Sequence, residues 1–311
     1  MKIIVTGALG HIGSFLVRDL ALSFPDSEVV MIDNMMTQRY SSLFNLPSIC
    51  RYRFIEANVT KIDLIPIFKS ADVVIHLAAI TDAAASFDKA DLVEANNYEA
   101  TLYVARACQE VGARLIVISS TSVYGSQSKL VSEDCSSEDL KPQSPYALTK
   151  LKEERLIYDL SHNGNLKAIS CRFGTIYGVS PGMRFHTAVN KFCWQAVMGQ
   201  PITVWTTAYD QKRPYLDLAD AARAISFIIS SNLFDGDIYN ILTQNLTVRE
   251  VVETIRDFVP DLHVTFVDSQ IMNQLSYEVS CEKFISKGFA FKGSLRKGVE
   301  DTISLLRQSN Q

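Results

Sequence analysis

Three glycines near the start of the chain, each separated from the next by two residues, constrain the fold more than any other feature. They lie in the run Gly7–Gly13, between the apolar stretch Lys2–Thr6 and the helical pattern of His11–Ser23. In such a strand–turn–helix context, the first glycine permits a tight turn, the second lets the backbone approach a pyrophosphate, and the third lets helix and strand pack closely. The amino end of the helix offers free N–H groups and a positive dipole to an anion. The run therefore predicts a dinucleotide-binding unit.

The first 172 residues alternate between short β-branched runs and longer helical patterns. Helices are expected over Leu92–Val111 and Pro145–Ser161 as well as after the glycine run. The strands are nearly all apolar, which is typical of a parallel sheet covered by helices on both faces. Because crossover connections are right-handed, we expect the α/β class with a doubly wound parallel sheet of the Rossmann type. The predicted strands are Lys2–Thr6, Glu28–Ile32, Arg51–Glu56, Asp72–His76, Arg114–Ser119 and Lys167–Arg172.

The regular alternation ends after Phe173, where glycine and proline gather at Gly178–Gly182. We therefore expect a dinucleotide-binding domain over residues 1–172, with returns near 214–243. A smaller, interleaved substrate-binding lobe is expected over residues 173–311. The elements predicted in this half are a helix over Thr187–Met198, a helical pattern over Arg223–Ser230 and a strand over Ile238–Asn240, the last two returning to the main sheet.

Asp33 lies at the end of the second predicted strand. Its distance from Gly13 along the chain suits a carboxylate that hydrogen-bonds the ribose hydroxyls of an adenosine. A carboxylate there repels a 2′-phosphate, so NAD is favoured over NADP. Arg39 lies nearby and could serve a phosphate, but we expect Asp33 to dominate the choice.

Composition and charge exclude several classes of partner. The formal net charge of −4 gives no general attraction to phosphate backbones, so we expect no nucleic-acid partner. No apolar run reaches membrane-spanning length and no signal-peptide pattern precedes the first strand, so we expect no membrane partner and a cytoplasmic location. The six cysteines are scattered without paired spacing, which favours free thiols over a metal site or a disulfide framework.

Tyr146 and Lys150 stand four residues apart on a predicted helix, so their side chains share one face. A neighbouring ammonium and the positive charge of an oxidised nicotinamide both favour the phenolate, so we expect the pKa of Tyr146 to fall toward neutrality. Such a tyrosine is a general base that takes a hydroxyl proton while hydride leaves the same carbon. The segment Ser119–Gly125 follows a strand at the carboxyl edge of the sheet, where a serine can hydrogen-bond the reacting oxygen.

These signals together resemble the extended short-chain dehydrogenase/reductase family, the nucleotide-sugar epimerases and dehydratases. The resemblance covers nearly the whole chain. It includes the glycine loop, Ser120 four residues before Tyr124, and the pair Tyr146 and Lys150. The further matching segments are His76–Ala79, Asn97–Thr101, Arg172–Gly178 and Arg213–Asp217.

The resemblance implies an NAD cofactor, a nucleotide-sugar substrate and a role for each matching residue. Tyr146 would be the base, Lys150 would hold the nicotinamide ribose, and Ser120 would orient the sugar hydroxyl. Arg213 matches a residue that binds the substrate diphosphate, a task for which an arginine fork is suited. The expected cofactor-binding residues are Gly7, Gly10, His11, Ile12, Gly13, Asp33, Asn34, Asn58, Val59, Leu77, Ala78, Ala79, Asn97, Tyr146 and Lys150. The expected substrate-binding residues are Ser120, Thr121, Thr175, Arg184, Asn190 and Arg213.

The residues between Ser120 and Tyr124 indicate which type of reaction the enzyme catalyses. Family members that eliminate water carry an acid and a base there, whereas this chain has Thr121 and Ser122, which do no acid–base work at neutral pH. We therefore expect the enzyme to oxidise or reduce the sugar at a single carbon, C4. A 4-epimerase, a dehydrogenase that releases the keto-sugar and a reductase of an incoming keto-sugar all remain open. A dinucleotide-sensing module without catalysis is less favoured, because Tyr146 and Lys150 are both present.

Two features of the second half concern the substrate. Many epimerases have an asparagine that contacts substrate where this chain has Thr175. Arg184 and His186 lie in an unusual loop, where they either face a substrate phosphate or an atypical sugar, or are solvated. Asn190 lies where some members contact the diphosphate.

Relatives of this type commonly pair as dimers through the two helices around Asn97–Val111 and Tyr146. The small residues of the first helix suggest a face suited to close helix packing. We therefore expect a homodimer that uses this face, which consists of Ala100, Val104, Ala107 and Cys108.

Overall fold

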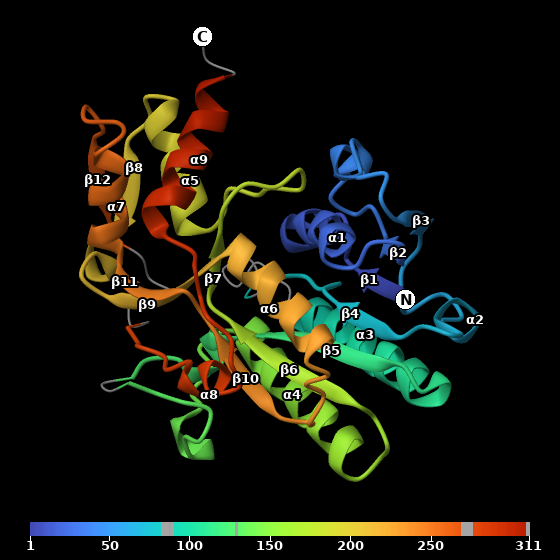
Figure 1. Ribbon diagram of the computed structural model, residues 1–311. Helices are drawn as coiled ribbons and strands as arrows, with labels where there is room; N and C mark the ends of the chain where they lie inside the picture. Colours follow the sequence, from blue (N-terminus) through green and yellow to red (C-terminus); the bar gives the residue numbers. More distant parts are fainter. Residues whose placement is uncertain (82–86, 88–89, 128–129, 269–275, 309–311) are drawn as a thin grey trace.

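A seven-stranded sheet forms the centre of the molecule (Figure 1). The computed structural model describes residues 1–81, 87, 90–127, 130–268 and 276–308. The strand order is β10-β6-β5-β4-β1-β2-β3, and every neighbouring pair is parallel. The predicted parallel sheet is therefore confirmed, with its six expected strands within one residue of the expected bounds at each end. The strands are β1 (Lys2–Thr6), β2 (Glu28–Asp33), β3 (Arg51–Glu56), β4 (Val73–His76), β5 (Arg114–Ser120), β6 (Ala168–Phe173) and β10 (Ile238–Ile241).

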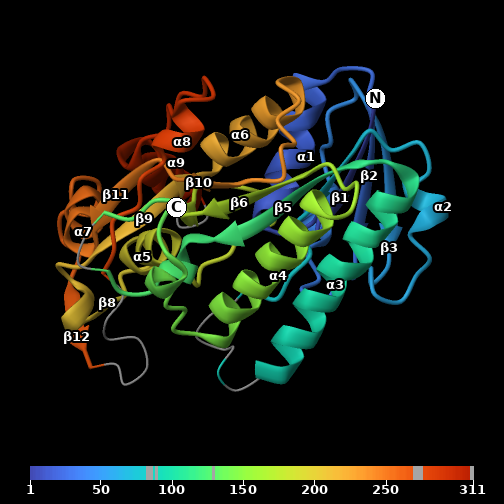
Figure 2. The same cartoon turned by 90° about the horizontal axis from the view of Figure 1, so that it is seen from below.

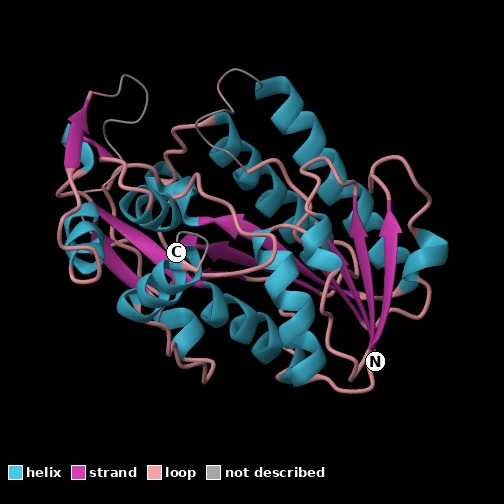
Figure 3. Ribbon diagram, turned by 90° about the horizontal axis from the view of Figure 1, so that it is seen from above, coloured by secondary structure: helices cyan, strands magenta, loops and turns pink. Residues whose placement is uncertain are grey.

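Helices cover both faces of this sheet (Figure 2 and Figure 3). One face carries α1 (His11–Ser23) and α6 (Leu218–Ser230), and the other carries α3 (Ala90–Val111) and α4 (Pro145–His162), with the short α2 (Ile65–Phe68) beside α3. Strands β4 and β6 are consequently buried at every position. This double cover explains why their sequences are mainly apolar on both faces, without alternation. No helix within the described ranges has the length and apolar character of a membrane span.

The predicted dimer face of α3 is wrong. Its four small residues are almost fully buried, and they pack against the sheet of the same chain. Small side chains at helical spacing serve close packing of a helix on a sheet as well as on another helix, and the sequence pattern alone does not separate the two. The residues concerned are Ala100, Val104, Ala107 and Cys108.

The second half builds a smaller lobe with a separate hydrophobic core, to which Val251 and Val299 contribute. It holds a three-stranded sheet, β11-β9-β7, and a two-stranded sheet, β12-β8. Its elements are β7 (Thr175–Tyr177), α5 (Ala188–Val197), β8 (Ile202–Trp205), β9 (Lys212–Asp217), β11 (Gln244–Thr247), α7 (Val248–Arg256), β12 (Val264–Val267) and α9 (Leu295–Arg307). The remaining short helices are η1 (Tyr40–Leu43), η2 (Thr121–Tyr124), η3 (Ser137–Asp139), η4 (Thr206–Ala208) and α8 (Glu282–Ile285).

Part of the second half returns to the main sheet. Strand β10 pairs with β6, and α6 packs beside α1. Helix α6 begins at Leu218, five residues before the predicted start, because the Asp217 carboxylate caps it by accepting from the N–H groups of Ala219 and Asp220. Residues 214–217 belong to β9, which pairs with β7 and β11 and not with the main sheet. The domain boundary at residue 172 stays a prediction.

An aromatic cluster attaches the tail of the chain to the outer strand of the sheet. Phe284 in α8 is fully buried. Its ring centroid lies 5.7 Å from that of Phe227 in α6, 5.8 Å from that of Tyr239 in β10 and 5.0 Å from that of Phe289. The cluster covers the end of the sheet with apolar surface contributed from three distant parts of the chain.

Replacement of Phe284 by alanine tests how much this cluster stabilises the fold. We expect Phe284→Ala to lower the free energy of unfolding by about 3–5 kcal/mol, because a buried ring is lost and a cavity remains. Chemical denaturation followed by circular dichroism measures the change. Phe44 is 61% exposed, so Phe44→Ala serves as the control and should change stability by less than about 0.5 kcal/mol. Equal effects of the two substitutions would contradict this account.

Candidate active site

The glycine loop lies where β1 and β4 end side by side. Gly7 has a φ of +66°, and a Cβ on this residue would lie 2.6 Å from the backbone nitrogen of Ala78. A Cβ on Gly13 would lie 2.5 Å from the carbonyl oxygen of Gly7. Any side chain at either position would push β1, α1 and the segment after β4 apart. The glycines therefore create the close backbone packing that a pyrophosphate cradle requires.

The Asp33 carboxylate lies at the rim of this loop. Its two oxygens accept hydrogen bonds from the backbone N–H groups of Leu9, at 3.0 Å, and Met35, at 2.9 Å. These bonds fix the carboxylate at the end of β2 and leave lone pairs for ribose hydroxyls. Asn34 beside it is exposed, and its side chain accepts from the N–H of Met36.

Buried polar contacts hold the segment after β4 against the glycine loop. The Thr6 hydroxyl lies 2.7 Å from Nδ1 of His76 and accepts from the N–H of Ala78. The Asn97 amide, buried in α3, binds both the N–H and the carbonyl of Ile80, at 2.8 and 2.9 Å. Asn97 thus shapes the predicted cofactor site by holding the backbone around Leu77–Ala79. At the end of β3, the Asn58 side chain accepts from Thr60 and Val59 is buried.

The structure brings together Ser120, Tyr146 and Lys150. Helix α4 starts at Pro145, where the Ser144 hydroxyl caps it by accepting from the N–H of Ala147. Tyr146 hydrogen-bonds the side chain of Ser120, which ends β5. The Lys150 ammonium lies 5.9 Å from the centre of the Tyr146 ring. A phenol, a serine hydroxyl and an ammonium thus meet at the carboxyl edge of the sheet, where open α/β sheets bind ligands.

The pKa of Tyr146 lies above its ordinary value, whereas the sequence predicted a fall toward neutrality. Burial raises this pKa, and the Glu153 carboxylate adds to the rise, whereas the charges of Lys150 and Arg184 and the hydrogen bond to Ser120 oppose it. The lysine alone does not produce a phenolate, because desolvation of the phenol outweighs its effect. The predicted fall in the pKa of Tyr146 also included the positive charge of an oxidised nicotinamide, which would lower this pKa further.

A buried ion pair fixes α4 against the sheet. The Glu154 carboxylate accepts from Nε and Nη2 of Arg172 in β6, at 2.9 and 2.7 Å, and from the Ser119 hydroxyl, at 2.5 Å. Nη1 of Arg172 donates to the Tyr124 hydroxyl, which donates to the Asn240 side chain in β10. This network sets the distance between Ser120 and Tyr146. Sequence reasoning did not identify Glu154, which lacked a recognisable partner along the chain.

Residues 178–186, here called the strap, lie across the glycine loop. The carbonyl of Gly178 lies 3.0 Å from Nε2 of His11, and the N–H of Gly182 donates to the Ser14 hydroxyl at 2.9 Å. A Cβ on Gly182 would lie 2.3 Å from the carbonyl oxygen of Leu9. The strap therefore connects the smaller lobe directly to the predicted pyrophosphate site.

Asn190 holds the strap in this position. Its amide accepts from the N–H of Gly178 at 3.2 Å and donates to the carbonyl of Arg184 at 3.2 Å. Since the side chain is fully buried and engaged with the strap, Asn190 acts on the site through the loop that it supports.

Positive charge gathers around the glycine loop. Burial lowers the pKa of His11 to about 4, and the nearby charges of Arg184, Arg39 and His186 lower it further. Arg184 also hydrogen-bonds the Thr81 hydroxyl and acts on the pKa of Tyr146. The charge of Arg184 therefore acts both at the glycine loop and at the tyrosine.

The remaining substrate candidates lie in β9, β7 and η2. Within the described part of the chain, Nε and Nη2 of Arg213 are buried without a hydrogen-bond partner, as expected of a site that receives an oxyanion. Thr175 lies in β7, beside Tyr215 of β9. Thr121 is buried, and its side chain binds the carbonyl of Phe173 and the hydroxyl of Tyr277. Sequence reasoning missed Tyr277, because nothing local connects it to Thr121.

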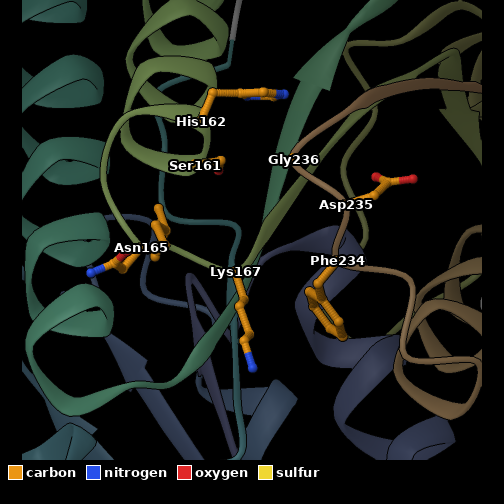
Figure 4. Close-up of a pocket in the computed structure, with 8 residues that line it drawn as sticks. Ser161, His162, Asn165, Lys167, Phe234, Asp235 and Gly236 are labelled. Carbon is orange, nitrogen blue, oxygen red and sulfur yellow. The ribbon is translucent and has the colours of Figure 1, made fainter.

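A hollow of about 340 Å³ lies at the opposite edge of the sheet (Figure 4). It is lined by the end of α4 and the start of β6, whereas the candidate site lies where β5 ends. None of the predicted site residues lines it. Nor do the described residues include a group of three or more His, Cys, Asp or Glu side chains that could hold a metal ion. The hollow is formed by Ser161, His162, Asn165, Leu166, Lys167, Phe234, Asp235 and Gly236.

Comparison with known proteins agrees with this geometry. A family model described as the NAD dependent epimerase/dehydratase family matches residues 3–241. The chain belongs to this family. An uncharacterized UDP-glucose epimerase of Bacillus subtilis is 32% identical over 83% of this chain and 82% of its own length. A trifunctional Arabidopsis thaliana enzyme with UDP-glucose 4,6-dehydratase, epimerase and reductase activities is 28% identical over 99% of this chain. This chain spans 47% of the length of that enzyme, about half.

The likeness extends to solved structures of the family. The UDP-glucuronic acid 4-epimerase from Bacillus cereus, in complex with UDP-glucuronic acid and NAD, is 28% identical with a TM-score of 0.86. The superposition covers 99% of this chain and 100% of that one. The protein is therefore an NAD-dependent enzyme of the extended short-chain dehydrogenase/reductase type. The glycine cradle, the Asp33 carboxylate and the positive charges around His11 fit that cofactor.

The contact between strap and glycine loop predicts how firmly NAD is held. We expect Gly182→Ala to displace the strap, because the new methyl group would overlap the carbonyl of Leu9. The variant should lose most of its NAD during gel filtration, measured as nucleotide released by denaturation. Met183→Ala, a change in the same strap that removes atoms and adds none, is the control. Full NAD retention by folded Gly182→Ala would contradict the assigned role.

Proposed function

We propose that this enzyme is a nucleotide-sugar 4-epimerase that oxidises and re-reduces the sugar at C4 on a retained NAD. The observation that carries the proposal is the meeting of Ser120, Tyr146 and Lys150 next to the glycine loop. These three residues supply what a hydroxyl oxidation requires: a base, a donor to the reacting oxygen and a positive charge beside the base.

The chemistry of these residues follows from their positions. When bound, NAD would supply the hydride acceptor and donor for the sugar carbon. Tyr146 takes the hydroxyl proton, while Ser120 holds the same oxygen through a hydrogen bond. Through its charge, Lys150 stabilises the phenolate form in which Tyr146 accepts this proton. Re-reduction on the other face of the keto-sugar returns the proton from Tyr146, so the enzyme regains its starting state without an external reductant.

The region after Ser120 disfavours dehydration. Elimination of water needs an additional acid and base beside the sugar. Thr121 is engaged with Phe173 and Tyr277, and the Ser122 hydroxyl donates to that of Ser120 at 2.9 Å. Neither residue has a carboxyl group. The dehydratase activity named for the plant relative is therefore not proposed for this chain.

The strap favours an epimerase over a dehydrogenase or a reductase. An enzyme that releases its keto-sugar must exchange NAD in every turnover, whereas an epimerase regenerates it in place. Residues 178–186 pack on the glycine loop through His11, Ser14 and Leu9, which opposes rapid exchange. A dinucleotide-sensing module without catalysis has no need of the complete set Ser120, Tyr146 and Lys150.

The proposed substrate is a nucleoside diphosphate sugar. Buried guanidinium nitrogens of Arg213 without a partner among the described residues support binding of a diphosphate. UDP-glucose and UDP-glucuronic acid are the first candidates, since the bacterial relatives are named for these sugars. Ser120, Thr175, Arg184 and Arg213 are proposed to contact the substrate, with Asn190 supporting the strap and the buried Thr121 supporting the segment after Ser120.

Replacement of Tyr146 by phenylalanine tests the proposed base. We expect Tyr146→Phe to lower kcat by at least about 100-fold, because the general base is lost while packing is kept. Conversion of UDP-glucose and UDP-glucuronic acid, followed by NMR, measures turnover, and bound NAD is quantified separately. Tyr158→Phe removes an exposed hydroxyl from the same helix and should leave both readouts unchanged. Undiminished turnover in Tyr146→Phe would rule out the assignment.

We further propose that the enzyme is a cytosolic homodimer that pairs through the outer faces of α3 and α4. Leu92 and Tyr103 on α3, and Leu148 and Tyr158 on α4, are large apolar side chains between 46% and 56% exposed. The two helices lie side by side on one face of the sheet (Figure 2). Such an apolar surface is typical of an interface. All six cysteines are free thiols, which suits a reducing compartment.

Charge placed on this surface tests the proposed dimer. We expect the wild type to have twice the mass of one chain in light scattering. The double variant Tyr103→Glu with Leu148→Glu should have the mass of one chain, because two buried carboxylates per subunit oppose association. Phe266→Glu introduces the same charge at an exposed position of β12 and is the control. A monomeric wild type, or a double variant that remains dimeric, would refute this interface.

A further inference from the structure

A buried glutamate one helical turn beyond Lys150 contacts its ammonium directly. Oε2 of Glu153 lies 2.8 Å from Nζ of Lys150, and the two side chains are 1% and 5% exposed. The same oxygen accepts a hydrogen bond from the Thr101 hydroxyl of α3 at 3.0 Å. The ammonium proposed to act on Tyr146 is therefore held from behind by a carboxylate that is itself held by a second helix.

This carboxylate is not required to anchor α4. The adjacent Glu154 performs that task through Arg172 and Ser119. Burying a charge is costly, and a buried ion pair contributes little net stability compared with apolar packing. Moreover, Oε1 of Glu153 has no hydrogen-bond partner among the described residues. The position of Glu153 beside Lys150 therefore calls for a role at the site.

Glu153 is the carboxylate that directly faces the ammonium. On α4, Glu154 also acts on the pKa of Lys150, but its two oxygens are engaged by Arg172 of β6. From β4, His76 faces Lys150 as a neutral ring, because burial and the lysine charge lower its pKa to about 3. From the strap, Arg184 contributes a second positive charge toward Tyr146.

We propose that Glu153 is a positioning residue of the reaction centre, which fixes the Lys150 ammonium and keeps Tyr146 protonated until the oxidised cofactor is in place. The inference rests on the proposed role of Tyr146 as the base. The carboxylate balances the charge of Lys150, so that the phenol, the ammonium and the carboxylate together carry no net charge. The positive charge of an oxidised nicotinamide then shifts the balance toward the phenolate, and proton removal from the sugar is coupled to the oxidised state of the cofactor.

The pKa shifts of Lys150 and Tyr146 agree with this role. Burial raises the pKa of Glu153 itself, and its contacts with Lys150 and Thr101 oppose this rise and favour the carboxylate. Burial lowers the pKa of Lys150, but Glu153 and Tyr146 more than offset it, so the pKa lies above its ordinary value. Burial raises the pKa of Tyr146, and the negative charge of Glu153 raises it further. Removing this charge therefore makes the first proton of the Tyr146–Lys150 pair easier to lose. Because the two groups titrate together, this statement applies to the pair.

The substitution Glu153→Gln tests the proposal, since it removes the charge and keeps the shape and the hydrogen-bonding oxygen. We expect the acid limb of the pH profile of kcat/KM, measured with UDP-glucose or UDP-glucuronic acid, to move to a pH lower by about one unit or more. An ultraviolet titration of the NAD-loaded enzyme without sugar, with the matching Tyr146→Phe variant subtracted, should show the same downward movement in tyrosinate formation. Glu153→Asp, which keeps the charge at a greater distance from Nζ, should produce a smaller movement in the same direction.

The matched control is Glu300→Gln. Glu300 pairs with Lys297 at the same three-residue spacing, at 3.3 Å, but on the exposed surface of α9. This variant should leave the profile and the titration unchanged. An unmoved acid limb and an unmoved titration in folded Glu153→Gln, or movement to higher pH, would overturn the inference. If neither sugar nucleotide is converted by the wild type, the proposed function fails, while the titration still decides whether Glu153 controls Tyr146. If Glu153→Gln does not fold, Glu153→Asp decides by the same readouts.

Discussion

The pairing of Glu154 with Arg172 is the interaction on which the arrangement of the site depends. It joins α4 to β6 beneath the ends of the strands, and its hydrogen bonds extend to Ser119 in β5 and Tyr124 in η2. Tyr146 lies two turns before this anchor and Ser120 directly after Ser119. Their side chains meet because both elements are fixed to the same ion pair. Breaking such a buried pair would leave an uncompensated charge, which typically costs several kcal/mol.

The charges around the glycine loop suit binding of the cofactor, and the charges around Tyr146 suit proton transfer. Around the glycine loop, the charges of Arg39 and Arg184 favour a diphosphate, while burial lowers the pKa of His11 and leaves its ring neutral. Around the base, Lys150 is balanced by Glu153, which leaves the phenol protonated in the absence of a further positive charge. The strap connects the two regions, since its residue Arg184 acts on both. Binding of the cofactor and readiness of the base are thereby coupled through a small number of charges.

Features that depend on neighbours in the sequence could be predicted, and features that depend on distant contacts could not. The glycine loop, Asp33 and the spacing of Tyr146 and Lys150 are local, and the structure places them as expected from local geometry. The close packing of Gly182 on Leu9 and the bond between Thr121 and Tyr277 join distant segments and leave no periodic signal. The face of α3 was misassigned for the same reason, because small residues suit a sheet or a helix as partner. The raised pKa of Tyr146 required knowledge of its burial.

The central claim is that hydride leaves and returns at C4 while NAD stays bound to the enzyme. Conversion of UDP-glucose carrying deuterium at C4, or of the equivalent UDP-glucuronic acid, tests it most directly. The epimerised product should retain the deuterium at C4, as read by NMR and mass spectrometry, with none in free NADH. Deuterium released into solvent, or recovered in NADH that has left the enzyme, would contradict it.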